Sequence, residues 1–234
     1  MIPTAPLASG RTADVYALAG DRVLRRYRSG GDVRAEAEMM RHLHAEGYPV
    51  PRVHHADGPD LVLEWVTGPT LVEALVGGDV GFRPAARLLV DLHSRLHALP
   101  AVRATDPAIR ILHLDLHPEN VILAPAGPVV IDWANAREGP SALDRAMTAL
   151  ILAEVAVDRS LPLSAAAHEL LTAYVAEAGP LESVAAAARL RAGLGTLDAA
   201  RLPEAVGLVL AAGAPGDPGG CQGSGATRPV TGPT

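Results

Sequence analysis

The sequence predicts an α+β protein of two lobes, a small lobe around an antiparallel sheet and a larger helical lobe that carries a polar hairpin. Residues 1–66 show strand-like alternation around one helix, whereas helical periodicity dominates after the Gly68-Pro69 break. Within the helical part, two short apolar runs flank the segment Ala-Pro-Ala-Gly-Pro, which is typical of a hairpin turn. We therefore expect an N-terminal lobe at 1–66 and a C-terminal lobe at 67–212.

In the N-terminal lobe we expect four strands and one helix. A turn at 9–12 precedes the strands, which are predicted at 15–18, 23–27, 50–55 and 61–66. The helix is predicted at 33–44, ahead of a typical C-terminal stop at Gly47. Its stripe at helical spacing comprises Val33, Ala37, Met40 and His44.

The C-terminal lobe is expected to be helical apart from the hairpin, whose strands are predicted at 120–123 and 129–132. An amphipathic helix is predicted at 85–99, with His93 and His97 in structural roles on its polar flank. Four further helices are predicted at 142–157, 164–178, 181–193 and 197–212. Residues 213–234 are so rich in Gly and Pro that we expect a disordered tail.

Composition and charge exclude several classes of protein. The net charge of −6 argues against nucleic acid or an anionic membrane as a partner, and every basic residue is Arg, with no Lys in the chain. The single Cys, Cys221, excludes an internal disulfide and a cysteine-based zinc site. The longest apolar stretch, 146–157, is too short to span a membrane, and the N-terminus does not resemble a secretory signal. We expect a soluble, cytoplasmic protein.

The densest polar segment in an apolar setting is His113-Leu114-Asp115-Leu116-His117-Pro118-Glu119-Asn120, followed by one apolar strand and then a second that ends in Asp132. A hairpin can bring Asp115, Asn120 and Asp132 to one point. The oxygens of Asn120 and Asp132 are ligands of the kind that Mg²⁺ prefers, and Asp115 remains free to accept a proton or to orient a hydroxyl. This is the layout of a phosphoryl-transfer site.

Two other interpretations of this segment stay open. Polar turns between strands are rich in Asp, Asn and His, so the motif could be purely structural. His113, Asp115 and His117 could also begin the metal site of a hydrolase, although no further donor stands at a convincing spacing.

The segment HLDLHPENVIL followed by VVIDW resembles the catalytic hairpin of the aminoglycoside phosphotransferase and choline kinase-like family, whose members are relatives of protein kinases. Other segments resemble the family in the same order: LASGRTADVYAL its nucleotide-covering loop, DRVLRRYR its phosphate-contacting strand, RAEAEMMRHL its acidic helix, LVLEWVTG its lobe hinge and LLVDLHSRLHAL the helix before the catalytic loop. The resemblance covers about residues 7–144 and implies a two-lobed protein-kinase-like fold with a nucleotide-binding N-terminal lobe.

The resemblance also implies a role for each matching residue. Asp115 would be the catalytic base or hydroxyl orienter, and Asn120 and Asp132 would hold Mg²⁺. Arg25 would contact the phosphates of ATP or GTP while paired with Glu36. The full set of implied nucleotide-binding residues is Ser9, Gly10, Arg11, Thr12, Val15, Val23, Arg25, Glu36, Glu64, Trp65, Val66, Leu123 and Ile131.

The chain departs from the family pattern at three places. Arg25 stands where the family usually has Lys, Leu114 replaces the usual Gly between His113 and Asp115, and the covering loop has one glycine, Gly10, where kinases have three. Glu38 competes with Glu36 as the ion-pair partner of Arg25. These departures keep a nucleotide-binding pseudokinase with a regulatory role as an alternative.

The predicted activity is therefore transfer of the γ-phosphoryl group of ATP or GTP to a hydroxyl of a small molecule, with antibiotics such as aminoglycosides among the candidates. The acceptor pocket is expected among the helices after Asp132. Acidic residues outnumber arginines over 141–212, but they are spread over four helices as solvated faces would be, so the sequence does not favour a polycationic acceptor. The Arg-only, Ala- and Gly-rich composition suggests a GC-rich bacterial genome. The sequence assigns no oligomeric state.

Overall fold

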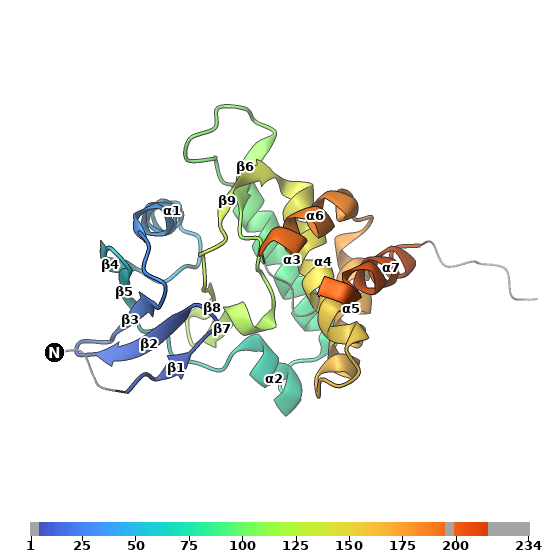
Figure 1. Ribbon diagram of the computed structural model, residues 1–234, viewed down its shortest axis with the longest axis horizontal. Coiled ribbons are helices and arrows are strands. Elements are labelled where there is room, and N and C mark those ends of the chain that lie inside the picture. The colour runs from blue at the N-terminus through green and yellow to red at the C-terminus, as the bar shows by residue number, and fades with distance from the viewer. Residues whose placement is uncertain (1–4, 195–198, 215–234) are drawn as a thin grey trace, which may run out of the picture.

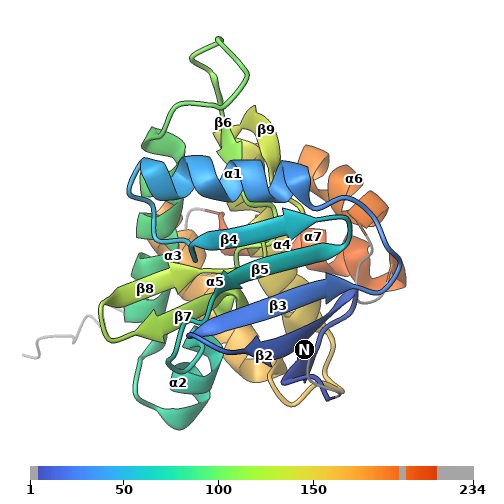
Figure 2. The same cartoon turned by 90° about the vertical axis from the view of Figure 1, so that its left-hand side faces the viewer.

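The computed structural model describes residues 5–194 and 199–214, and their strands and helices separate into a sheet lobe and a helical lobe (Figure 1). The sheet is antiparallel, with strand order β1-β2-β3-β5-β4. Its strands are β1 (Ala8–Ser9), β2 (Ala13–Leu18), β3 (Arg22–Tyr27), β4 (Val53–Asp57) and β5 (Asp60–Glu64). Helix α1 (Arg34–Ala45) runs alongside β4 at one edge of the sheet (Figure 2).

The N-terminal lobe differs from the prediction in detail. The short strand β1 was not predicted, and β4 and β5 are displaced from 50–55 and 61–66 because their turn forms at Gly58-Pro59. The buried stripe of α1 consists of Ala37, Met40 and Leu43, whereas His44 is exposed. The predicted stripe was therefore wrong at His44.

In the described part of the chain, six α-helices form the helical lobe. They are α2 (Leu71–Gly77), α3 (Phe82–Ala98), α4 (Ser141–Val157), α5 (Ser164–Ala178), α6 (Val184–Leu194) and α7 (Leu202–Ala212). Helix α4 contacts α5, α6 and α7 and is buried on most of its surface. A helix that is apolar all round in this way belongs in a core.

Helix α2 was not predicted, although its N-terminal signal is present in the sequence. The side chain of Thr70 accepts a hydrogen bond from the Glu73 amide at 3.2 Å, and the Glu73 carboxylate accepts one from the Thr70 amide at 2.7 Å. Such a reciprocal capping box can start a helix, even a helix as short as α2. Helix α3 begins at Phe82, earlier than the predicted 85, because Pro84 is tolerated in a first helical turn.

Two strand pairs lie within the helical lobe. Strands β7 (Val121–Ala124) and β8 (Gly127–Val130) form the predicted hairpin, with Asp132 just beyond its end. The pair of β6 (Ile109–Leu112) and β9 (Arg137–Pro140) was not predicted, because its two strands are far apart in sequence and short. Together these pairs bracket the segment 113–120.

The segment between the lobes is attached to the hairpin at Gly68. A Cβ atom at this residue would lie 2.4 Å from the carbonyl oxygen of Leu123, and the φ angle of Gly68 is 146°. The Leu123 amide donates to the Pro69 carbonyl at 2.8 Å, and the Val130 amide donates to the Pro49 carbonyl at 2.8 Å. Only glycine permits this close approach, which holds the hairpin at the junction of the two lobes.

A buried polar cluster lies beneath the segment 113–120. His93 and His97 belong to α3, and both were predicted on its polar flank. They are instead buried where α3 packs against its neighbours. His97 Nε2 is 2.9 Å from Asp144 Oδ2, and His93 Nδ1 is 3.2 Å from the Tyr174 hydroxyl. Burial lowers the pKa of His93 to about 3, so the imidazole is neutral in the folded protein.

The remaining predicted segments lie near the C-terminus. The helix predicted at 197–212 begins at Leu202, after a 3-10 turn at Ala199–Arg201, while 197–198 lie outside the described residues. The predicted tail lies outside them from residue 215 onward. In the described part of the chain, every helix is too short or too polar to cross a lipid bilayer.

The neutral state of His93 predicts a pH dependence of stability. In the unfolded chain this imidazole takes up a proton below about pH 6.5, but in the folded protein it does so only near pH 3. Stability therefore falls as the pH drops below 6.5, by up to about 1.4 kcal/mol per pH unit from this group. Urea unfolding of wild type and His93→Gln between pH 7.5 and 4.5 should show a shallower fall in the variant.

Exposed His168 on α5 provides the matched control, because His168→Gln should keep the wild-type slope. Parallel pH profiles for wild type and His93→Gln would contradict this account of the buried imidazole.

Candidate active site

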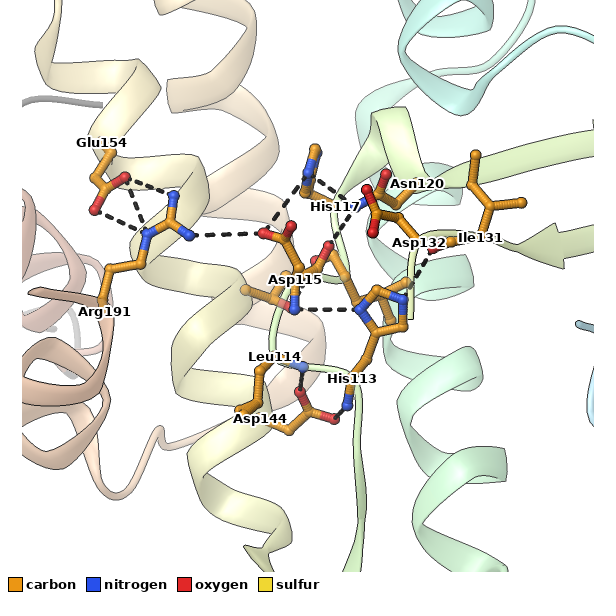
Figure 3. Close-up of polar contacts among 12 residues, drawn as sticks. His113, Leu114, Asp115, His117, Asn120, Ile131, Asp132, Asp144, Glu154 and Arg191 are labelled. Carbon is orange, nitrogen blue, oxygen red and sulfur yellow. Dashed lines mark hydrogen bonds and ion pairs between the residues drawn. The ribbon is translucent and has the colours of Figure 1, made fainter. Parts of the chain in front are cut away.

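The segment 113–120 connects β6 to β7 and is fixed at His113, as Figure 3 shows. The His113 imidazole lies 3.0 Å through Nε2 from the Ile131 carbonyl and 3.2 Å through Nδ1 from the Asp115 amide. The geometry fits a neutral ring that donates to the former and accepts from the latter. The ring also packs at 65° against Trp133, with 4.6 Å between centroids. His113 therefore couples the loop to the end of the hairpin.

Asp144, in the first turn of α4, anchors the same loop from below. Its carboxylate accepts hydrogen bonds from the amides of His113 at 3.0 Å and Leu114 at 2.7 Å. Burial alone would raise the pKa of this carboxyl, but the hydrogen bond from His97 and the loop amide hold it below its usual value. An ionised, fully buried carboxylate thus sets the path of the chain just before Asp115.

Leu114 occupies a left-handed backbone conformation, with φ of 61°. This conformation costs an L-residue about 1–2 kcal/mol, which explains why the family usually has Gly here. The Leu114 side chain is fully buried, and burying a leucine contributes about 1.5–3 kcal/mol. Burial therefore offsets the backbone strain, and the loop keeps its path without glycine.

Asn120 ends a 3-10 turn, Pro118–Asn120, and points its amide across the loop. Its Nδ2 donates to the Asp115 carbonyl at 2.8 Å and lies 3.2 Å from His117 Nε2. Burial lowers the pKa of His117, so this imidazole is neutral and can accept. Both bonds use the amide nitrogen, which leaves Oδ1 of Asn120 as an oxygen donor for a cation.

The arrangement does not support a hydrolase metal site at His113, Asp115 and His117. Both ring nitrogens of His113 and Nε2 of His117 already face hydrogen-bond partners. Within residues 5–194 and 199–214, no group of three His, Cys, Asp or Glu side chains is placed to hold a metal ion.

Arg25 on β3 links the sheet lobe to the hairpin. Its Nη1 is 3.2 Å from Glu36 Oε1 and its Nη2 is 2.6 Å from Asp132 Oδ1. Glu36 also accepts from the Tyr27 hydroxyl at 2.7 Å, whereas Glu38 pairs with Arg103 at the surface. Of the two acidic candidates, the structure therefore brings Glu36 to Arg25.

Charge and burial explain why these groups depend on one another. Burial lowers the pKa of Arg25, but the carboxylates of Asp132 and Glu36 outweigh it and raise the pKa above its usual value. At Glu36 burial outweighs the nearby cation and raises the pKa of the carboxyl. Without Arg25, Glu36 would be a buried carboxylate with little compensation.

Asp115, Asn120 and Asp132 line one cavity of about 360 Å³. Asp132 has a φ of 62°, a conformation that Asp tolerates better than most residues. With Arg25 on Oδ1, the other carboxylate oxygen of Asp132 remains for a cation, beside Oδ1 of Asn120. Two hard oxygen donors and an open cavity fit Mg²⁺, which usually keeps several water or phosphate ligands.

The predicted phosphate-covering loop is held by its own hydrogen bonds. The Gly10 amide donates to the Ala13 carbonyl at 2.9 Å, and Arg28 donates to the carbonyls of Gly10 and Arg11. Ser9 lies in β1, Thr12 just precedes β2, and Arg11 lines the cavity that also contains Asp115. The Gly10 amide is thus already engaged rather than directed at a phosphate.

The other predicted nucleotide contacts come from both sides of the lobe junction. Val15 and Val23 lie on adjacent strands β2 and β3, with Val15 opposite Arg25. Leu123 is on β7, Ile131 follows β8, and Glu64, Trp65 and Val66 lead out of β5. The Trp65 amide donates to the Asp21 carbonyl and the Glu64 amide to the Arg52 carbonyl, both at 2.9 Å, so these two amides are already engaged within the lobe.

Sequence analysis missed a buried ion pair next to Asp115. Arg191 on α6 forms a two-pronged pair with Glu154 on α4, with Nη2 2.9 Å from Oε2 and Nε 3.1 Å from Oε1. Its Nη1 lies 3.6 Å from Asp115 Oδ1 (Figure 3). The charges of α4 and α6 were interpreted as solvated faces, which is wrong for these two residues. The available signal was a charged residue, Arg191, within a helix rich in Ala and Leu.

Comparison with known proteins was consistent with this geometry. The family model described as "Phosphotransferase enzyme family" matches residues 4–108 and 79–191. No curated protein sequence is significantly similar to the chain.

Several solved structures share the fold at low sequence identity. An amicoumacin kinase bound to AMP-PNP, Ca²⁺ and its antibiotic is 14% identical over 87% of this chain and 77% of its own, with a TM-score of 0.52. A thermostable mutant of the aminoglycoside phosphotransferase APH(4)-Ia with AMP-PNP and hygromycin B is 13% identical over 91% and 95%, with a TM-score of 0.54. A streptomycin–ATP complex of APH(2")-IIa is 12% identical over 90% of both chains, with a TM-score of 0.51.

The left-handed backbone at Leu114 predicts that glycine is a less destabilising replacement than alanine at this position. Leu114→Ala removes the buried side chain and keeps the strain, whereas Leu114→Gly removes both. Both variants should be less stable than wild type, but Leu114→Gly should be the more stable of the two by about 1 kcal/mol. Urea unfolding measures the difference, and an Ala variant as stable as the Gly variant would contradict it. Ala86, buried in α3 at ordinary helical geometry, gives the control, because Ala86→Gly should destabilise.

The role of Arg25 predicts a large effect of removing its charge. Arg25→Met should cost about 3 kcal/mol of stability, because it leaves buried Glu36 without its cation. Arg28→Met, which breaks the more exposed pair with Asp14, should cost less than about 1 kcal/mol. Chemical denaturation of both variants tests the contrast, and equal losses would show that Arg25 does not stabilise Glu36.

Proposed function

Because the chain belongs to the phosphotransferase enzyme family, we propose that it transfers the γ-phosphoryl group of ATP, or of GTP, to a hydroxyl group of a small molecule. The observation that carries this proposal is that Asp115, Asn120 and Asp132 line one cavity. A loop carboxylate with a separate pair of oxygen ligands is the arrangement that phosphoryl transfer requires.

Asp115 would act on the acceptor hydroxyl. The Asp115 amide donates to His113 and the Asp115 carbonyl accepts from Asn120. These bonds fix the backbone from which the Asp115 side chain enters the cavity. As the hydroxyl oxygen bonds to the γ-phosphorus, the bond from that phosphorus to the β–γ bridging oxygen breaks and the nucleoside diphosphate leaves. The hydroxyl proton passes to the Asp115 carboxylate.

Asn120 and Asp132 would hold Mg²⁺, which would neutralise negative charge that develops on the phosphate during transfer. The amide nitrogen of Asn120 is held by the Asp115 carbonyl, so its oxygen is oriented before any cation arrives. Such preorganisation lets the site stabilise charge without rearrangement during the reaction.

Arg25 would hold the phosphates from the sheet side. Its guanidinium is already close to Asp132 and is only 11% exposed, which keeps a positive charge at the cleft at all accessible pH values. The neighbouring complexes that contain AMP-PNP or ATP support a nucleotide as the phosphoryl donor.

A nucleotide-binding protein without turnover is the second candidate, and one observation favours it. Arg25 Nη2 lies 2.6 Å from Asp132, the carboxylate that would hold Mg²⁺, so the guanidinium competes with the cation. A protein that kept this contact when nucleotide is bound would bind nucleotide yet transfer phosphate poorly.

Thermal unfolding with and without nucleotide tests the proposal. At a nucleotide concentration about 100 times Kd, linkage contributes about 2.7 kcal/mol, or about 5–10 °C in Tm for a chain of this length. Mg·ATP or Mg·GTP should produce this shift in wild type and in Asp115→Asn, whereas Asp132→Asn should lose its Mg²⁺-dependent part. ADP or GDP release should fall by about 10²–10⁴-fold in Asp115→Asn.

The outcomes separate the two candidates. A shift in Tm with no diphosphate release from wild type, under conditions that include candidate acceptors, would favour the binding protein. Unchanged Tm in every sample would contradict both candidates.

A further inference from the structure

The cavity that contains Asp115 extends away from the sheet lobe, between α2 and the packed pair α4 and α5. Its volume of about 360 Å³ lies at the lower end of the usual range for small-molecule sites, about 300–1,000 Å³. Asp115 and Asp132 lie at one end of it. A molecule in this cavity would present a hydroxyl to Asp115 and the rest of its surface to the three helices.

The helices present aliphatic side chains to the cavity. The principal ones are Val72, Leu75 and Val76 from α2, Ile151 and Val155 from α4, and Leu170 from α5. Val76 is 65% exposed and so adds accessible apolar surface to this wall. Lining of this kind binds apolar surface and supplies few hydrogen bonds.

Three carboxylates of the same helices are already bonded to other protein groups. Glu73 caps its own helix, Glu154 is buried against Arg191, and Glu177 pairs with Arg87 at 3.0 Å. In the described part of the chain, no carboxylate of α2, α4 or α5 lines the cavity. A molecule with several ammonium groups would therefore find no paired charge along this wall, and desolvating unpaired charges is costly.

Outside these helices the cavity is lined by the carboxylates of Asp115, Asp132 and exposed Glu119 and by two cations, Arg11 and Arg191. Arg191 is 4% exposed, and its Nη1 has no hydrogen-bond partner although it points at Asp115. Two of the other guanidinium nitrogens are bonded to Glu154, so the group is held rigidly at the catalytic end of the cavity. Because Glu154 balances its charge, this guanidinium offers N–H donors but no net attraction to a cationic substituent next to the reacting hydroxyl.

From this lining and charge we propose that the phosphoryl acceptor is a largely apolar alcohol without a cluster of positive charges, seated against α2, α4 and α5. This inference rests on the proposed phosphotransferase function and narrows its acceptor. It separates the chain from the aminoglycoside-bound neighbours, whose acceptors are polycations.

Two adjacent alanines of α5 provide a matched pair of variants. Ala166 lines the cavity and is half-buried, whereas Ala165 is exposed and does not line it. Ala166→Glu places a carboxylate among the aliphatic side chains, and Ala165→Glu adds the same charge to the same helical turn outside them. Both substitutions lie in the first turn of α5, where Glu is favourable, so both variants should fold.

The experiment measures Tm in Mg·AMP-PNP, and phosphate transfer from Mg·ATP, with two sets of probes. The apolar set is a neutral steroid alcohol and a long-chain diol, and the polycationic set is hygromycin B and gentamicin. We expect at least one apolar probe to raise Tm and to accept phosphate, while the polycations do neither. Ala166→Glu should weaken that response roughly tenfold or more, and Ala165→Glu should leave it unchanged.

Each other outcome overturns the inference. Preferential phosphorylation of the polycations contradicts the proposed acceptor class, as does equal loss of the response in both variants. A response to Mg·AMP-PNP with no response to any apolar probe also counts against the acceptor class but leaves the proposed function standing. No response to Mg·AMP-PNP removes the proposed function itself.

Discussion

The structure depends on one buried carboxylate, that of Asp144. It accepts hydrogen bonds from the amides of His113 and Leu114, two residues that are themselves buried. His97 and α3 keep this carboxylate ionised in the core. Its two oxygens fix the backbone before Asp115, including the strained φ angle of Leu114. The direction of the reactive side chain is therefore set from within the helical lobe, by a residue that would not contact substrate.

Arg25 fixes the position of the two lobes relative to each other, as Asp144 fixes the loop before Asp115. One guanidinium reaches Glu36 on α1 and Asp132 beyond the hairpin, so the position of the sheet lobe is tied to the group proposed to hold Mg²⁺. Its planar fork can contact two carboxylates in fixed directions, which a lysine ammonium does with less geometric definition. Replacement of Lys by Arg thus changes the geometry at the cleft while it preserves the charge that Glu36 needs in order to remain ionised.

The helical lobe distributes charge unevenly around Asp115. On the side of Asn120 and Asp132, oxygens are left for a cation, whereas on the side of α4, α5 and α6 the carboxylates are paired and aliphatic side chains face the cavity. The Arg191–Glu154 pair is buried and needs both members, because either charge alone would be uncompensated. The arrangement proposed for phosphoryl transfer is in this way combined with an aliphatic wall, which is proposed to hold the acceptor.

The sequence by itself determined the features that depend on neighbours along the chain: the β7–β8 hairpin, the helices α1, α3, α4 and α5, and the spacing that lets Asp115, Asn120 and Asp132 meet. Those features follow from local periodicity and turn residues. Only the tertiary structure decided that His93 and His97 are buried, that β6 pairs with β9, and that Arg191 reaches Asp115 from α6. The physical reason is that a polar side chain is equally compatible with water and with a buried partner, and which one it meets depends on segments that are distant in sequence.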